Sequence, residues 1–102
     1  MYALSGIAYG ALTGRPAFSG KDIPRVVHEV MTKLPPRPSQ LSRVPPVVDD
    51  VLRIGMAKSP DERFDSAKEL AVALSDALAG NVDEAIADRA ASLNAKLRWA
   101  KR

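Results

Sequence analysis

The first fourteen residues constrain the fold most, because they carry no charge. They read Met-Tyr-Ala-Leu-Ser-Gly-Ile-Ala-Tyr-Gly-Ala-Leu-Thr-Gly, and the first charged side chain is Arg15. A helix through this run is apolar on nearly every side, which is typical of a helix buried all round. The run is shorter than the roughly 20 residues of a membrane span, and it lacks the basic start of a signal peptide. We therefore expect a helix that other parts of a larger cytoplasmic protein cover.

The rest of the chain predicts four more helices and no strand. Residues 22–33 and 47–58 each place apolar side chains on one face of a helix. A third helix begins at the capping box Ser66–Glu69 and runs to Leu78, and a fourth runs from a second capping box, Asn81–Glu84, to about Lys101. No stretch alternates apolar and polar residues for long enough to form a strand. We predict an all-α fold of about five helices.

Prolines separate the helices predicted over residues 22–33 and 47–58. Five of the eight prolines lie between Pro35 and Pro46, and this density predicts an extended connection without helix. The sequence Pro35-Pro-Arg-Pro38 also has the spacing of a ligand for aromatic-lined grooves. We favour the simple connection.

Composition excludes several classes of chemistry. The 102 residues contain no cysteine and a single histidine, His28, which excludes disulfides, thiol catalysis and a zinc cage made of protein ligands. Fifteen basic residues against twelve acidic ones give a net charge of +3. That surplus is too small to indicate nucleic-acid binding by itself.

Three spaced motifs resemble the C-terminal part of the large lobe of bacterial serine/threonine protein kinases. They are Tyr2-Ala-Leu4, Leu12-Thr-Gly-Arg-Pro-Ala-Phe18 and Lys58-Ser-Pro-Asp-Glu-Arg-Phe64. The resemblance covers residues 1–79 and implies that residues 1–13 form the central buried helix of the lobe. Residues 80–102 lie beyond it, as an additional amphipathic helix. Ser5 stands where the family usually has glycine, and Ser59 replaces the usual acidic residue before Pro60.

The motifs of phosphoryl transfer are absent from this chain. A kinase needs a glycine-rich loop, a strand lysine, a catalytic-loop Asp and Asn, and the Asp of an Asp-Phe-Gly triplet. The sequence has no G-x-G-x-x-G, His-Arg-Asp or Asp-Phe-Gly. We expect no catalytic, cofactor-binding or metal-binding residues here, although the full-length family uses ATP and magnesium. The simplest account is a truncated kinase that is inactive alone.

Arg63 is the residue that the resemblance singles out. Its counterpart in the family forms a buried ion pair with a glutamate of an Ala-Pro-Glu motif, which this sequence lacks. A buried charge without a partner costs about 3–5 kcal/mol. We therefore predict that Arg63 is exposed or paired with one of the nearby carboxylates of Asp61, Glu62 and Asp65.

Two surfaces offer alternatives to the kinase reading. The helix over 22–33 is similar to the family helix that docks substrates and regulators, and it suggests an interaction module that binds a protein partner. The residues concerned are Ile23, Val26, Val27 and Val30. A basic C-terminal surface could contact membrane or nucleic-acid phosphates, which we favour less than a helix packed on the bundle. Its residues are Lys96, Arg98, Lys101 and Arg102.

For the other polar residues that could belong to a functional site, we expect ordinary structural positions. We expect His28 to be exposed. Asp49 and Asp50 could suggest a metal site or acid–base chemistry, but adjacent helical residues point about 100° apart, so we expect a solvated helix face instead. An apolar first helix without its cover would favour self-association.

Overall fold

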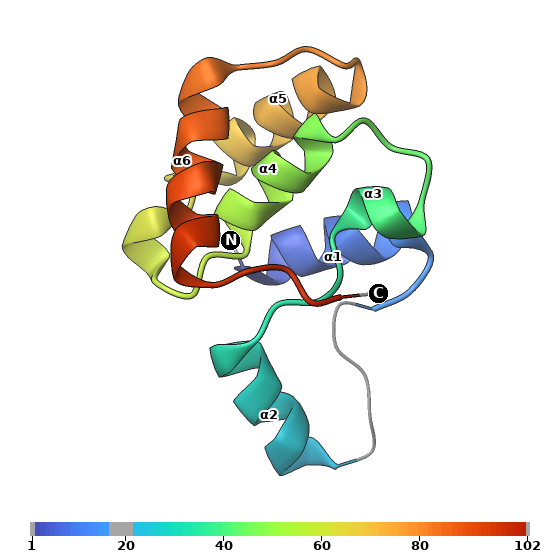
Figure 1. The fold of residues 1–102 in the computed structure, drawn as a ribbon, viewed down its shortest axis with the longest axis vertical. Helices are drawn as coiled ribbons and strands as arrows, with labels where there is room; N and C mark the ends of the chain where they lie inside the picture. Colours follow the sequence, from blue (N-terminus) through green and yellow to red (C-terminus); the bar gives the residue numbers. More distant parts are fainter. Residues whose placement is uncertain (1, 17–21, 102) are drawn as a thin grey trace.

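The computed structural model describes residues 2–16 and 22–101, and it is helical (Figure 1). The helices are α1 (Tyr2–Thr13), α2 (Ile23–Thr32), α3 (Pro38–Leu41), α4 (Val47–Gly55), α5 (Ala67–Leu78) and α6 (Glu84–Lys96), with a 3₁₀ turn, η1, at Pro60–Glu62. Within these described ranges the only β-type pairing is an isolated parallel bridge between Pro36 and Ala100. The predicted all-α fold is confirmed, with one short helix more than expected.

Helix α4 forms the centre of the molecule. It packs against α5 and α6 and also contacts α1 and α3 (Figure 1). Val48, Leu52 and Ile54 are fully buried, and Val51 is 1% exposed. The apolar face predicted for residues 47–58 is therefore the core of the fold.

Helix α1 buries one face rather than its whole circumference. Ser5 and Tyr9 are buried, whereas Leu4 is 41% exposed and Ile7 is 69% exposed. The buried face lies very close to α4, because a Cβ added at Gly55 would overlap the Ser5 hydroxyl and lie 3.0 Å from the Ser5 Cβ. The described chain therefore leaves part of α1 uncovered, α4 takes the central place, and burial of α1 by other parts of a larger protein stays a prediction.

The proline-rich connection is extended at its ends but contains a helical turn. The prediction that residues 35–46 exclude helix is wrong for Pro38–Leu41. Pro38 occupies the first helical position, where the missing N–H of proline costs nothing. The next free N–H, on Ser39, donates to the Asp49 carboxylate over 2.9 Å. This long-range cap from α4 stabilises a turn that local sequence rules disfavour.

Helix α6 is shorter than predicted. It ends at Lys96, and residue 97 already has an extended backbone. Trp99 is then buried, and the Ala100 N–H donates to the Pro35 carbonyl over 3.1 Å. Burying this indole against the body requires the chain to leave the helix, so the predicted end near Lys101 is wrong.

The predicted cap is confirmed at the start of α5 but not at the start of α6. The Ser66 hydroxyl accepts from the Glu69 N–H over 3.1 Å, as the capping box predicts. Helix α6 is instead capped by Asp83, whose carboxylate accepts from the N–H of Ala85 at 2.9 Å. The cap of α6 is therefore Asp83, two residues after the Asn81 that the second capping box predicts.

Helix α2 projects from the body of the molecule (Figure 1) and has no buried residue. Asp22 caps its start by accepting from the Arg25 N–H over 3.3 Å. Near its end, the Val30 carbonyl accepts from the Lys58 Nζ over 2.6 Å. Within residues 2–16 and 22–101, no helix combines the length and apolar character that crossing a bilayer requires.

Candidate functional site

A cluster of two cations and one aromatic ring lies where α4 leads into η1. The Lys58 Nζ is 5.3 Å from the centroid of the Tyr2 ring, and the Arg63 Cζ is 5.1 Å from it. Cations within about 6 Å of a ring centroid are attracted to the face of the ring. The first and third sequence motifs therefore meet in space through these three side chains.

Arg63 is bound by main-chain oxygens. Its Nε donates to the Ala57 carbonyl over 2.7 Å, and an Nη donates to the Lys58 carbonyl over 3.3 Å. The side chain is half-buried, and among the described residues it forms no ion pair with a carboxylate. The prediction of exposure or of a local carboxylate partner is wrong, because the carbonyls that follow α4 take that place. The planar guanidinium suits such a two-point grip.

Lys58 links three parts of the chain. Its Nζ donates to the Val30 carbonyl and, over 3.2 Å, to the Tyr2 hydroxyl. Burial, together with the positive charges of Arg53 and Arg63, lowers the pKa of Lys58 to about 8. The sequence motif contained Lys58, but its spacing could not reveal a contact with α2.

The two cations of this cluster donate to main-chain carbonyls and to the Tyr2 hydroxyl, so they connect α1, α2 and the segment between α4 and η1. Among the described residues there is no group of three or more His, Cys, Asp or Glu side chains that could hold a metal ion.

Comparison with known proteins finds relatives that are similar to most of this chain. The chain is 44% identical to the serine/threonine-protein kinase PknD of Mycobacterium tuberculosis over 80 residues, which is 76% of this chain and 12% of that protein. Over most of its length the chain is thus homologous to part of a bacterial serine/threonine protein kinase. The chain is also 33% identical to PknH of Mycobacterium bovis over 89 residues, and 35% identical to PknE of M. tuberculosis over 80 residues.

The chain spans only about one eighth to one seventh of the length of these relatives. It covers 86% of its own length in the match to PknH, but only 15% of PknH; for PknE the shares are 78% and 14%. No family model matches the sequence. No solved structure matches it either.

The structure describes only part of the second motif, Leu12–Phe18. Gly14 ends α1 with a φ of 78°, a left-handed conformation that glycine adopts without strain. The Thr13 hydroxyl donates to the Tyr9 carbonyl over 2.8 Å. Phe18, the last residue of that motif, lies outside the described residues.

The predicted docking face lies along α2 and is open. Ile23 is 67% exposed and Val27 is 52% exposed, whereas Val26 and Val30 are half-buried. Met31 continues the same stripe and is 69% exposed. His28 is exposed beside it. The stripe therefore forms an apolar surface on a helix that projects into solvent.

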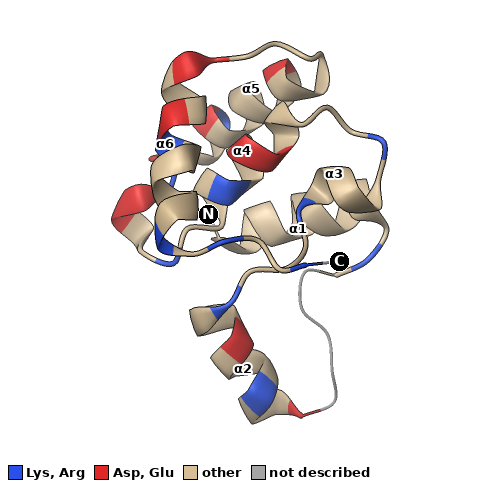
Figure 2. Ribbon diagram, in the orientation of Figure 1, with Lys and Arg blue, Asp and Glu red and all other residues tan. Residues whose placement is uncertain are grey.

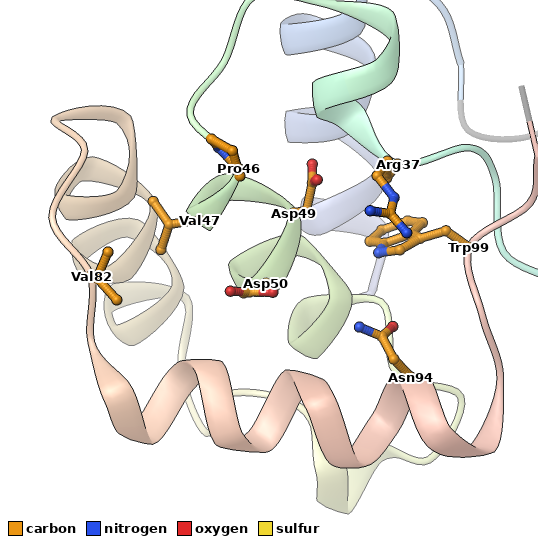
Figure 3. Close-up of a pocket in the computed structure, with 8 residues that line it drawn as sticks. All are labelled: Arg37, Pro46, Val47, Asp49, Asp50, Val82, Asn94 and Trp99. Atoms are coloured by element: carbon orange, nitrogen blue, oxygen red, sulfur yellow. The ribbon is translucent and has the colours of Figure 1, made fainter.

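Asp49 does not lie on a solvated face, so that prediction is wrong. It is 7% exposed and accepts from both the N–H and the hydroxyl of Ser39. Asp50 is half-buried, and its pKa is raised by burial and by the charge of Asp49, an effect that Arg37 opposes. Figure 3 shows both carboxylates around a pocket that Arg37, Asn94 and Trp99 also line.

The residues of the predicted basic surface do not lie together: Lys96, at the end of α6, is separate from Arg98 and Lys101. The Lys96 Nζ pairs with the Glu62 carboxylate at 2.7 Å. Arg98 and Lys101 are exposed and line a different hollow, which Arg37 also lines. Arg102 lies outside the described residues. The sequence missed Arg37 as a member of this surface, because 61 residues separate it from Arg98 along the chain.

Proposed function

We propose that this chain is a non-catalytic part of a serine/threonine kinase lobe that acts by docking other proteins. The observation that carries the proposal is the uncovered apolar stripe of α2 on a segment homologous to kinases. Folding alone would favour a helix that buries such a stripe. A helix held out from the body with its apolar residues exposed is typical of an interaction site.

The absence of phosphoryl-transfer motifs supports the non-catalytic half of the proposal. Neither the phosphate-binding loop nor the metal-binding and catalytic aspartates occur in the sequence. Lys58 and Arg63 are the cations nearest the junction of α4 and η1, and both already have partners. Lys58 donates to the Val30 carbonyl, and Arg63 donates to the carbonyls of Ala57 and Lys58. ATP and magnesium therefore belong to the full-length family in this proposal.

A second apolar surface supports packing against further kinase elements. Leu4 and Ile7 of α1 and Leu74 of α5 line a small, nearly wholly apolar groove between the two helices. We propose that this groove packs against another part of a kinase lobe, and that self-association occurs where such a part is missing. In this proposal the apolar stripe of α2, in contrast, binds a separate protein.

The test of catalysis is a calorimetric titration of the chain with magnesium and ATP, together with a radiolabelled phosphoryl-transfer assay. We expect no saturable heat and no transfer. Saturable nucleotide binding with phosphate incorporation would overturn the non-catalytic assignment.

The test of docking places a photo-reactive amino acid at position 27, on the apolar stripe, and at position 25, on the opposite face of α2. We expect a discrete cross-linked product from position 27 that is lost when Val30→Glu is added. Position 25 is the matched control, because Arg25 is exposed and its side chain pairs only with Glu29 on the same helix. Equal cross-linking from both positions would contradict the proposal.

A further inference from the structure

We propose that the hollow lined by Arg37, Arg98 and Lys101 binds a phosphate monoester, in the form carried by a phosphorylated serine or threonine of another protein. These three cations come from the start of α3 and from the segment that follows α6. Figure 2 shows that this segment is basic, while the first turns of α6 are acidic. The fold thus gathers three positive side chains that the sequence separates.

The polar groups between these cations are hydrogen-bond donors of the kind that phosphate oxygens need. Gln40 and Asn94 line the same hollow. The Asn94 carbonyl oxygen already accepts from the Arg53 Nε over 3.1 Å, so the amide nitrogen is the atom that Asn94 can offer. Arginine and lysine together with amide N–H groups form the usual set of ligands for a phosphate.

A buried positive charge lies behind this set of donors. Arg53 is 2% exposed, and its guanidinium donates to Asn94 and to the carbonyls of Leu93 and Leu97. One of its Nη atoms is buried without a hydrogen-bond partner among the described residues, and no carboxylate there forms an ion pair with it. Burial lowers the pKa of Arg53, and the Glu62 carboxylate stabilises the charge against this larger effect, but Glu62 forms no ion pair with the guanidinium. A charge in a low-dielectric surrounding acts over a longer range than one in water, so Arg53 adds positive potential to the hollow.

The size of the hollow favours a single phosphorylated side chain. Its volume is about 340 Å³, which lies at the small end of the range for ligand pockets. A nucleic-acid site of ordinary strength would need a longer basic stripe, but within the described part of the predicted basic surface the remaining residue, Lys96, is paired with Glu62. A membrane site would need an exposed apolar wedge, and Trp99 is only 8% exposed.

The neighbouring carboxylates limit the affinity without closing the site. Asp49 and Asp50 line the adjoining pocket, which shares Arg37, Asn94 and Trp99 with the hollow (Figure 3). Asp49 is held by Ser39, while the Asp50 carboxylate lies close enough to Arg37 for the arginine to lower its pKa. Removing the charge of Asp50 should therefore strengthen phosphate binding.

Trp99 provides the measurement, because it is the only tryptophan of the chain and lines the hollow. We would titrate the full chain with a short phosphoserine peptide and follow Trp99 fluorescence. The same peptide without phosphate, inorganic phosphate and a single-stranded oligonucleotide of equal charge serve as comparisons. We expect saturation by the phosphopeptide, weaker binding of inorganic phosphate, and no response to the unphosphorylated peptide.

Charge-removing variants connect the signal to the hollow. Arg98→Gln and Lys101→Gln should each weaken phosphopeptide binding roughly tenfold, the value of one hydrogen bond between charged groups. Asp50→Asn should strengthen it. Lys68→Gln is the matched control, since Lys68 is an exposed lysine on α5, and it should change nothing. Arg98 and Lys101 are exposed, so these variants should retain the melting temperature of the parent chain.

Three results would overturn the proposal. They are tighter binding of the oligonucleotide than of the phosphopeptide, inorganic phosphate binding as tightly as the phosphopeptide, and an equal loss with Lys68→Gln. The first indicates a nucleic-acid surface, the second a site for free anions, and the third a non-specific effect of net charge.

Discussion

The Asp49 carboxylate accepts two hydrogen bonds from Ser39, one from its N–H over 2.9 Å and one from its hydroxyl over 2.5 Å. Ser39 is the second residue of α3, and Asp49 belongs to α4. A side chain ten residues away thus caps a four-residue helix that could not persist alone. The contact fixes the proline-rich connection to the core.

Removing this carboxylate should destabilise the fold. We expect Asp49→Ala to lower the free energy of unfolding by about 1–3 kcal/mol, because it leaves the half-buried N–H and hydroxyl of Ser39 without their acceptor. Asp50→Ala is the control. The raised pKa of Asp50 means that folding disfavours its charged form, so this second variant should be neutral or stabilising at pH 7. Urea denaturation measures both, and an equal loss in the two variants would contradict the role of Asp49.

Lys58 should make stability depend on pH in the alkaline range. Its pKa falls from 10.5 to about 8 on folding, so between these values the unfolded chain binds more protons than the folded chain. The free energy of unfolding contributed by Lys58 therefore rises with pH through this window. The raised pKa values of Tyr2 and Tyr9 act in the opposite direction only above about pH 10.

The measurement compares urea midpoints at pH 7 and pH 9.5 in the parent chain, Lys58→Met and Lys68→Met. We expect the gain on raising the pH to disappear in Lys58→Met and to persist in Lys68→Met, whose lysine is exposed. A gain of equal size in all three would assign the effect to other groups.

Arg63 should stabilise the junction of α4 and η1 even without a carboxylate partner. Arg63→Met removes hydrogen bonds to the carbonyls of Ala57 and Lys58 and the contact with the Tyr2 ring. We expect a loss of about 1–3 kcal/mol, the range for hydrogen bonds of a charged group. Arg25→Met, which removes only an exposed pair with Glu29, should change stability by less than about 1 kcal/mol. Thermal unfolding of the two variants distinguishes these values.

The contact between Ser5 and Gly55 should show coupling between α1 and α4. Gly55→Ala should destabilise the chain by about 1–3 kcal/mol, because the added methyl overlaps Ser5 and the core is already filled. Ser5→Gly creates the missing space, so the double variant should recover part of the loss. Ser5→Ala alone should be neutral or stabilising, since the Ser5 hydroxyl is buried without a hydrogen-bond partner in the described chain. Strictly additive melting temperatures would contradict this coupling.

Periodicity predicted the helices that build the core, and long-range contacts decided the rest. The apolar face of residues 47–58 and the cap at Ser66 could be predicted, because both depend on neighbours within a few turns. The turn at Pro38–Leu41 and the end of α6 could not. The first depends on Asp49, and the second depends on a place for Trp99 against the body.

For the candidate sites too, the sequence predicted what depends on nearby residues and missed what depends on contacts between distant parts of the chain. The α2 stripe follows from the spacing of its apolar residues, and the structure adds that the stripe is uncovered. Arg63 was found through its motif, but its partners are main-chain oxygens that no side-chain pattern could indicate. Arg37 and Lys58 acquire their roles only when α2, α3 and the last residues are placed in space.

Pro35 and Pro36 connect the two ends of the described chain in a way that affects how it unfolds. The Tyr9 hydroxyl donates to the Pro36 carbonyl over 2.6 Å, and the Ala100 N–H donates to the Pro35 carbonyl. The first helix and the last described residues are therefore bound to the same two prolines in the middle of the chain. Fraying from either end breaks this shared junction, so loss of one end weakens the hold on the other. That arrangement favours a single cooperative transition for the body of the molecule, with α2 free to exchange its amide hydrogens earlier.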